Sequence, residues 1–241
     1  ISDLLYTTER SALANLTREG IASERVHFVG NVMIDTLRHN LARAVSAAET
    51  LNGAGIEGNF GKGEFAVLTL HRPSNVDHES TLRQLLQTVN EVANRLPVVF
   101  PLHPRTRGRI EHFQLDHLLT QANIHLLPPQ GYLQMLGLMR DARFVFTDSG
   151  GIQEETTALG VPCLTLRENT ERPITVEEGT NTIVGQSHDA IMRAVNDILA
   201  SGGKGGRVPE YWDGHAADRI VTHLRGWLAQ RAAHPQAQAV A

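Results

Sequence analysis

The clearest chemical signal in this 241-residue sequence is Ser149-Gly150-Gly151, which stands between an apolar run, Phe144–Thr147, and a helical pattern, Ile152–Leu159. A strand that passes directly into a helix places unpaired N–H groups and the positive end of the helix dipole at the carboxyl edge of the sheet. Glycine lets an anion approach the backbone closely, and the Ser149 hydroxyl adds a donor. The pattern predicts a phosphate site; the alternative is that Ser149 is only a helix cap.

Glu155 comes three residues after Ile152 and borders the helix face formed by Ile152, Thr156 and Leu159. We therefore expect it to point back toward a ligand at the helix start, where a carboxylate accepts both hydroxyls of a ribose. We expect its neighbour Glu154 to face solvent. The alternative is a pair of exposed helical glutamates.

A second polar loop, Arg167–Pro173, follows the apolar run Cys163–Leu166. Arg172 would neutralise a pyrophosphate there, and Thr180 or Asn181 would add hydrogen bonds. The alternative is ordinary solvated loop charge.

Histidines follow two other predicted strands. His71 and Arg72 come after Phe65–Leu70, and this pair suits phosphate binding and proton transfer beside a departing nucleotide. His103 follows Val98–Leu102 in the weakest of the four sites. A structural role is the alternative for a lone histidine.

These loops need a sheet that brings strand ends together. The β-rich runs that predict strands are Asp3–Thr7, Val26–Val29, Phe65–Leu70, Val98–Leu102, Ile124–Leu126, Arg143–Thr147 and Cys163–Leu166. The periodic stretches that predict helices are Glu9–Glu19, Met33–Thr50, Ser80–Leu96, Arg107–Leu119, Tyr132–Arg140, Ile152–Leu159, His188–Leu199 and His215–Gln230. Strands that alternate with helices predict a parallel sheet covered on both faces.

Composition narrows the class of protein. The 22 basic and 26 acidic residues give a formal charge of −4 without long charge blocks, so no footprint for nucleic acid or an anionic membrane is present. No apolar run reaches the ~18 residues of a membrane span. Cys163 is the single cysteine, which excludes an intrachain disulfide, and its apolar setting predicts a buried side chain. We expect a cytoplasmic protein without a metal site.

Three segments are expected to lack regular packing or to mark a boundary. Gly53–Gly63 carries five glycines and predicts a mobile loop, and His234–Ala241 predicts a disordered end. Ile1 is neither an initiator methionine nor part of a signal sequence, and Leu4–Thr8 already has a strand pattern. We therefore expect the chain to begin inside a fold.

Taken together, these motifs resemble the non-hydrolysing UDP-N-acetylglucosamine 2-epimerases. The similarity extends to about Gly185, and its matching stretches are Gly30–Asp35, His71-Arg72-x-x-Asn75, Pro129-Gln130-x-Tyr132-Leu133, Thr147–Glu155, and Thr170–Pro173 through Gly179-Thr180.

The resemblance implies an α/β, Rossmann-like parallel sheet with helices on both faces, the C-terminal half of a two-domain fold like that of the B-type glycosyltransferases. Residues 1–31 would be the end of the first domain, 32–208 the UDP-binding domain, 209–230 a crossover helix and 231–241 a disordered tail. The first domain's opening strands would be absent from this chain.

The family's roles carry over to matching positions. His71 would act beside the leaving UDP, and Arg72 would contact phosphate. The remaining UDP-binding positions are Gln130 and Met135 at the uracil, Ser149, Gly150 and Gly151 at the diphosphate, Glu155 at the ribose, and Arg172 at a phosphate. The chain departs from the family at Met135, where an aromatic residue is frequent, and at Ser74, where Glu is frequent.

The reaction implied is inversion at C2 of UDP-N-acetylglucosamine, by loss of UDP to give 2-acetamidoglucal and re-addition on the other face, without a cofactor. The resemblance implies that the family's essential carboxylates lie on segments outside this chain, so we expect it to bind UDP weakly and not to epimerise alone. The full-length protein would be a homodimer. The alternatives are a hydrolysing epimerase that releases N-acetylmannosamine, a glycosyltransferase donor domain, and a UDP-sugar-binding module without turnover.

Overall fold

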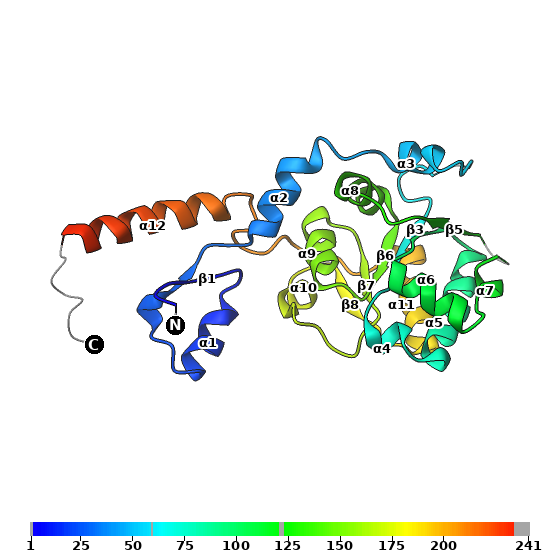
Figure 1. The fold of residues 1–241 in the computed structure, drawn as a ribbon, viewed down its shortest axis with the longest axis horizontal. Helices are drawn as coiled ribbons and strands as arrows, with labels where there is room; N and C mark the ends of the chain where they lie inside the picture. The colour runs from blue at the N-terminus through cyan, green and yellow to red at the C-terminus, as the bar shows by residue number, and fades with distance from the viewer. Residues whose placement is uncertain (1, 59, 121–122, 234–241) are drawn as a thin grey trace. The chain divides into compact units, whose positions relative to one another are not determined.

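A computed structural model describes residues 2–58, 60–120 and 123–233 (Figure 1). The chain divides into two compact units, one of residues 1–39 with 209–241 and the other of residues 40–208. Because the second unit contains the loops singled out above, its sheet is the frame of the candidate site.

A six-stranded parallel sheet forms the centre of the larger unit. Its strands lie in the order β5-β4-β3-β6-β7-β8. Their bounds are β3 Ala66–Thr69, β4 Val98–Pro101, β5 Ile124–Leu127, β6 Phe144–Thr147, β7 Cys163–Thr165 and β8 Asn181–Ile183. The chain builds outward from β3 to one edge and then from β6 to the other, so neighbouring β3 and β6 flank the topological switch point of a Rossmann-like sheet.

Helices cover both faces of this sheet. On one face α5 (Glu79–Ala93) packs against α11 (His188–Ser201), with α6 (Pro104–His112) and α7 (His117–Thr120) beside them. On the other face α3 (Ala47–Gly53) packs against α8 (Tyr132–Asp141), and α8 contacts α9 (Gly150–Leu159). Figure 1 shows α8 and α5 on opposite sides of the strands. Two short helices, α4 (Pro73–Val76) and α10 (Pro173–Glu177), follow strand ends.

The central strands are apolar on both faces, as the unbroken runs predict. In β3, Ala66 and Leu68 face the α5 side, whereas Val67 faces the α8 side, and all three are fully buried. Burial on two faces is typical of a parallel sheet between helical layers. The expected fold class is confirmed.

The smaller unit contains a two-stranded parallel sheet, β1 (Leu5–Thr7) and β2 (Val26–Phe28). Its helices are α1 (Ser11–Arg18), the 3-10 helix η1 (Ser23–Arg25), α2 (Val32–Leu41), which continues into the larger unit, and α12 (Ala216–Ala233). The Asp35 carboxylate caps α12 by accepting from the N–H groups of Ala216 and Ala217 at 3.1 and 2.7 Å. Trp212, 1% exposed, donates to the Thr8 carbonyl.

Two predicted helices are each divided in the structure. Met33–Thr50 is α2 and α3, because Ser46 adopts an extended backbone and caps a new helix by accepting from Glu49 N–H. Arg107–Leu119 is α6 and α7, and Gln114 between them has a positive φ of 55°. Periodicity continued across both breaks, so it did not reveal them.

Other expectations fall at the chain's periphery. The predicted tail began at residue 231, but α12 continues to Ala233; residues 234–241 lie outside the described residues, as does Asn59 in the predicted 53–63 loop. Strand β8 was not predicted. No helix among the described residues is long and apolar enough to cross a membrane.

Helix α8 contains a glycine that packing requires. A Cβ at Gly137 would overlap the carbonyl oxygen of Val45, whereas a Cβ at Gly108 in α6 would meet no atom within 4 Å. We expect Gly137→Ala to lower the free energy of unfolding by about 1–3 kcal/mol through overpacking. Gly108→Ala should raise it by up to about 1 kcal/mol, because alanine is the better helix former. Urea denaturation of both variants checks this, and equal effects would contradict the contact.

Candidate functional site at the switch point

The candidate site lies at the carboxyl edge of the sheet, where the ends of β3, β4, β5 and β6 converge. A pocket of about 210 Å³ opens there. It is lined by Thr69, Leu70, His71, Pro101, His103, Pro129, Gln130, Met135, Ser149 and Ile152. Open α/β sheets bind ligands in this position. Pockets that enclose a drug-sized ligand measure ~300–1,000 Å³, so this one can enclose only part of a nucleotide sugar.

Asp148 holds the two central strand ends together. Its side chain is fully buried, and its carboxylate accepts from the backbone N–H groups of His71 and Arg72 at 3.0 and 2.9 Å and from Asn75 Nδ2 at 3.1 Å. Burial by itself would raise the pKa of Asp148, but the hydrogen bonds from His71 and Arg72 outweigh burial and lower it. Asp148 is therefore an ionised carboxylate beneath the pocket.

His71 rests on this carboxylate. Its Nδ1 lies 2.9 Å from Asp148 Oδ1, and its side chain is 36% exposed. The ring of His103 lies 5.6 Å away, centroid to centroid. Two imidazoles from neighbouring strand ends thus share one wall of the pocket.

Helix α9 begins at the pocket without a side-chain cap. Ser149 occupies the N-cap position with an extended backbone, and its side chain makes no capping hydrogen bond. Its own backbone N–H donates to Thr147 Oγ1 at 3.0 Å. Since the first N–H groups of a helix find no partner within it, those of Gly150 and Gly151 remain for an anion.

Arginines surround this helix start. Arg72 Nη2 lies 4.0 Å from Glu171, and Arg167 binds both oxygens of the same carboxylate. A Cβ placed at Gly150 would lie 3.7 Å from Arg172 Cγ, which puts Arg172 directly against α9. The hydrogen bond from Arg167 is the main cause that lowers the pKa of Glu171 to about 2.

Glu154 was expected to face solvent, and this is wrong. It is 3% exposed, and its Oε1 lies 3.0 Å from Arg172 Nε. Helix α9 is packed between the sheet and neighbouring helices, so both Glu154 and Glu155 point inward. The ion pair holds Arg172 at the helix start.

Glu155 lies against the beginning of α8, where its carboxylate accepts a hydrogen bond from Tyr132. It is 7% exposed, and burial, more than the charge of Glu154, raises its pKa. The same pairing raises the pKa of Tyr132, again with burial as the main cause. Because Tyr132 comes two residues after Gln130, Glu155 lies near the chain segment that lines the pocket.

Thr180 and Asn181 were expected to reach a pyrophosphate, and they do not. The Thr180 hydroxyl donates to the Val161 carbonyl, and Asn181, fully buried, donates to Gln153 Oε1 at 3.1 Å. Gln153 also accepts from Thr170. This internal network ties α9 to the loop that carries Arg172.

The structure therefore gathers the predicted site residues in three groups. His71, Gln130, Met135 and Ser149 line the pocket; Arg72, Gly150, Gly151 and Arg172 lie around the α9 start; and Glu155 is set against α8.

Two contributors, Asp148 and Tyr132, were not predicted as site residues, although both lie in the matching stretches. The one available signal for Asp148 was a charged residue directly after an apolar strand. His103, predicted as the weakest of the four sites, does line the pocket. Arg105, beside His103, turns away and pairs with Asp77.

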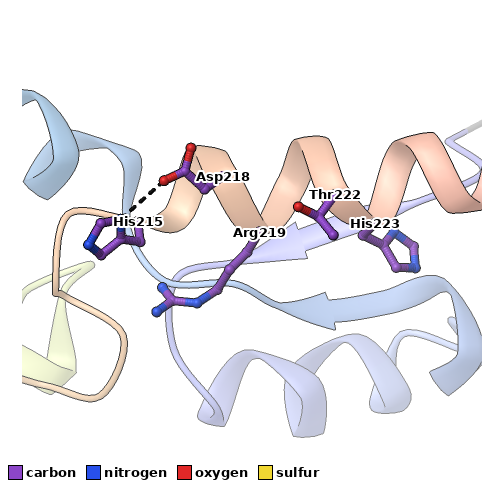
Figure 2. Close-up of a pocket in the computed structure, with 5 residues that line it drawn as sticks. All are labelled: His215, Asp218, Arg219, Thr222 and His223. Atoms are coloured by element: carbon purple, nitrogen blue, oxygen red, sulfur yellow. Dashed lines mark hydrogen bonds and ion pairs between the residues drawn. The ribbon is translucent and has the colours of Figure 1, made fainter.

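A second hollow, of about 660 Å³, lies along α12 and is lined by His215, Asp218, Arg219, Thr222 and His223 (Figure 2). Most of its polar groups already have partners. His215 Nδ1 lies 3.1 Å from Asp218, Arg219 donates to the Val29 carbonyl, and His223 Nδ1 lies 3.0 Å from the Tyr6 hydroxyl. This hollow has fewer groups left for a ligand than the switch-point pocket.

Among the described residues no cluster of His, Cys, Asp or Glu could hold a metal ion. Cys163 is fully buried, as predicted, and burial raises the pKa of its thiol to about 12.

The strand order and the pocket define a Rossmann-like α/β protein of the class that takes ligands at the switch point. The sequence profile of the UDP-N-acetylglucosamine 2-epimerases matches residues 1–225. The chain belongs to this family.

Individual relatives agree. The chain is 37% identical to a UDP-N-acetylglucosamine 2-epimerase of Methanococcus maripaludis, over 83% of the chain and 55% of that protein. It is 35% identical to a UDP-2,3-diacetamido-2,3-dideoxy-D-glucuronate 2-epimerase of Pseudomonas aeruginosa, over 93% and 60%. The Methanocaldococcus jannaschii UDP-GlcNAc 2-epimerase, solved with UDP-GlcNAc and UDP, matches with a TM-score of 0.77 and 35% identity, over 92% of this chain and 61% of that one. The chain thus spans less than two thirds of these proteins.

The Tyr132–Glu155 contact makes a pH-dependent prediction. We expect Tyr132→Phe to lower the free energy of unfolding by about 1 kcal/mol near neutral pH, because a buried carboxylate loses a donor. The pKa of Glu155 is raised in the folded protein, so its charge destabilises the fold at high pH and this cost disappears as the pH falls through that pKa. The effect of Tyr132→Phe should shrink over the same range.

Urea denaturation at several pH values measures this effect. Tyr211→Phe is the matched control, since Tyr211 is similarly exposed, 38% against 39%. A pH-independent loss in Tyr132→Phe, or an equal loss in the control, would contradict a charged partner for Tyr132.

Proposed function

We propose that this chain supplies the UDP-binding half of a non-hydrolysing UDP-N-acetylglucosamine 2-epimerase. The observation that carries the proposal is the convergence, at one switch point, of an uncapped helix start, three arginines and a histidine held by a buried carboxylate. These features suit a uridine diphosphate that leaves a sugar. The N–H donors and the positive charge bind its phosphates, and the imidazole can exchange a proton near the bond between C1 and the diphosphate.

The nucleotide would lie across the carboxyl edge of the sheet, with its uracil, ribose and diphosphate bound by different residues. The 210 Å³ pocket takes the uracil, against Gln130 and Met135. The diphosphate lies at the start of α9, with Arg72 and Arg172 as counter-charges. The ribose hydroxyls donate to Glu155, whose position beside α8 connects the pocket with the helix start.

We assign residues 32–208 as the UDP-binding domain, 1–31 as the end of the preceding domain and 209–230 as the crossover helix. The compact unit of residues 40–208 supports the first assignment, since it carries every proposed UDP contact. A cytoplasmic location and a homodimer of the full-length protein stay predictions from the resemblance.

In the proposed reaction a base removes the C2 proton while UDP leaves C1, and UDP then adds back to 2-acetamidoglucal with a proton delivered to the opposite face. The groups described here stabilise the departing UDP. We propose that the groups that transfer the C2 proton belong to the part of the relatives that this chain does not span, and that the chain by itself binds UDP without epimerising.

Two alternatives share the binding half. A hydrolysing epimerase would release free N-acetylmannosamine in place of the UDP-linked product. A different sugar is also open, because the Pseudomonas relative is named for a diacetamido-glucuronate substrate. Contacts to UDP do not distinguish these sugars.

Proton NMR of UDP-N-acetylglucosamine with the chain in D₂O tests both binding and turnover. We expect the uridine signals to broaden while C2 keeps its proton. Deuterium at C2 with a UDP-linked manno product would show that the chain is catalytically complete, and free N-acetylmannosamine would favour the hydrolysing type. Unchanged uridine signals at high protein concentration would contradict the UDP site.

Glu155→Gln tests the ribose contact. The amide keeps the side chain's volume but offers one acceptor oxygen in place of two, so we expect UDP affinity to fall roughly tenfold, the equivalent of about one charged hydrogen bond. Titration calorimetry measures it. Glu177→Gln, at an exposed position on α10, is the control and should bind UDP as the unmodified chain does. Equal affinities for both variants would remove Glu155 from the site.

A further inference from the structure

The Asp148 carboxylate accepts from four donors, all of them in the loop that follows β3. Three of its donors, the backbone N–H groups of His71 and Arg72 and the Asn75 amide, belong to the chain that turns out of β3. The fourth donor, Nδ1 of the His71 ring, comes from the same loop and lies 2.9 Å from Oδ1. Asp148 thus binds both the backbone and the ring of one residue.

Double attachment restricts the imidazole. The backbone N–H of His71 and its Nδ1 both reach the same buried carboxylate, so rotation of the ring would break a charge-assisted hydrogen bond without water to replace it. Nε2 lies on the other side of the ring from Nδ1, so it points away from Asp148, and His71 is one of the residues that line the pocket. Among the described residues no hydrogen bond of Nε2 is present.

The partner of one imidazole nitrogen decides which nitrogen carries the proton in the neutral ring. An ionised carboxylate accepts only, so His71 must keep a proton on Nδ1 to retain the contact. The hydrogen bond from His71 also helps to keep the pKa of Asp148 low despite its burial. The proton that His71 gains or loses is then the one on Nε2.

We propose that Asp148 is a positioning residue that fixes His71 as the Nδ1–H tautomer and leaves Nε2 as the only proton-exchanging atom toward the ligand. The role of this tautomer in the reaction rests on the proposed function. When Nε2 is protonated, the ring donates to an oxygen of the departing diphosphate, and Asp148 stabilises the imidazolium. Asp148 itself stays ionised and does not touch the nucleotide.

Imidazole ¹⁵N NMR of the whole 241-residue chain, at a pH where His71 is neutral, tests the proposal without any nucleotide. The His71→Asn variant identifies the His71 signals by their loss. We expect the unmodified chain to show N–H on Nδ1 and an unprotonated Nε2, and Asp148→Asn to shift the population toward Nε2–H. An Nε2–H tautomer in the unmodified chain, or an unchanged tautomer in Asp148→Asn, overturns the proposal.

Asn75→Ala separates positioning from a structural role. It removes another donor from the same carboxylate at a fully buried position, so it should lower the free energy of unfolding while His71 keeps its Nδ1 proton. If Asp148→Asn does not fold, Asn75→Ala and the unmodified chain decide: a retained Nδ1–H supports the proposal, and its loss shows that the loop, not the carboxylate, sets the tautomer.

A UDP titration of the same samples keeps the two hypotheses apart. The tautomer is determined in the free protein, so a chain that fails to bind UDP but shows the Nδ1–H form contradicts the proposed function alone. A chain that binds UDP with His71 as Nε2–H contradicts this inference alone.

Discussion

A single buried carboxylate connects the parts of this site. Removing an ion from water costs several kcal/mol, so Asp148 can remain charged at zero exposure only because donors surround it. Those donors come from the loop after β3, while Asp148 itself follows β6. The electrostatic requirement of one side chain therefore fastens together the two strand ends that flank the switch point.

The topology of the sheet brings these two strand ends together. Parallel strands bring all their carboxyl ends to one edge, and the reversal of strand order between β3 and β6 opens a crevice at that edge. Helix α9 starts at this crevice with glycines and without a side-chain cap. Backbone geometry thus provides the anion-binding groups, and the side chains add charge and orientation.

Internal acids hold the arginines in place before any ligand arrives. Glu154 pairs with Arg172 from within the core, and Glu171 engages Arg167 and approaches Arg72 from the exposed side. Such preorganisation limits the side-chain entropy lost when an anion binds. It also means that a diphosphate would compete with Glu171, a half-exposed carboxylate whose displacement costs less than that of a buried one.

Local patterns in the sequence determined every strand but β8, most helices, the Ser149-Gly150-Gly151 helix start and the family motifs, because those depend on neighbours within a few residues. Only the tertiary structure decided which side chains meet. Asp148 and His71 are 77 residues apart, and Glu154 turns inward because α9 is packed on several sides, a situation that helical spacing does not encode. Thr180 and Asn181 are polar residues typical of a loop, but they lie at the start of the short edge strand β8. Their side chains form buried hydrogen bonds with distant partners, which local polarity does not reveal.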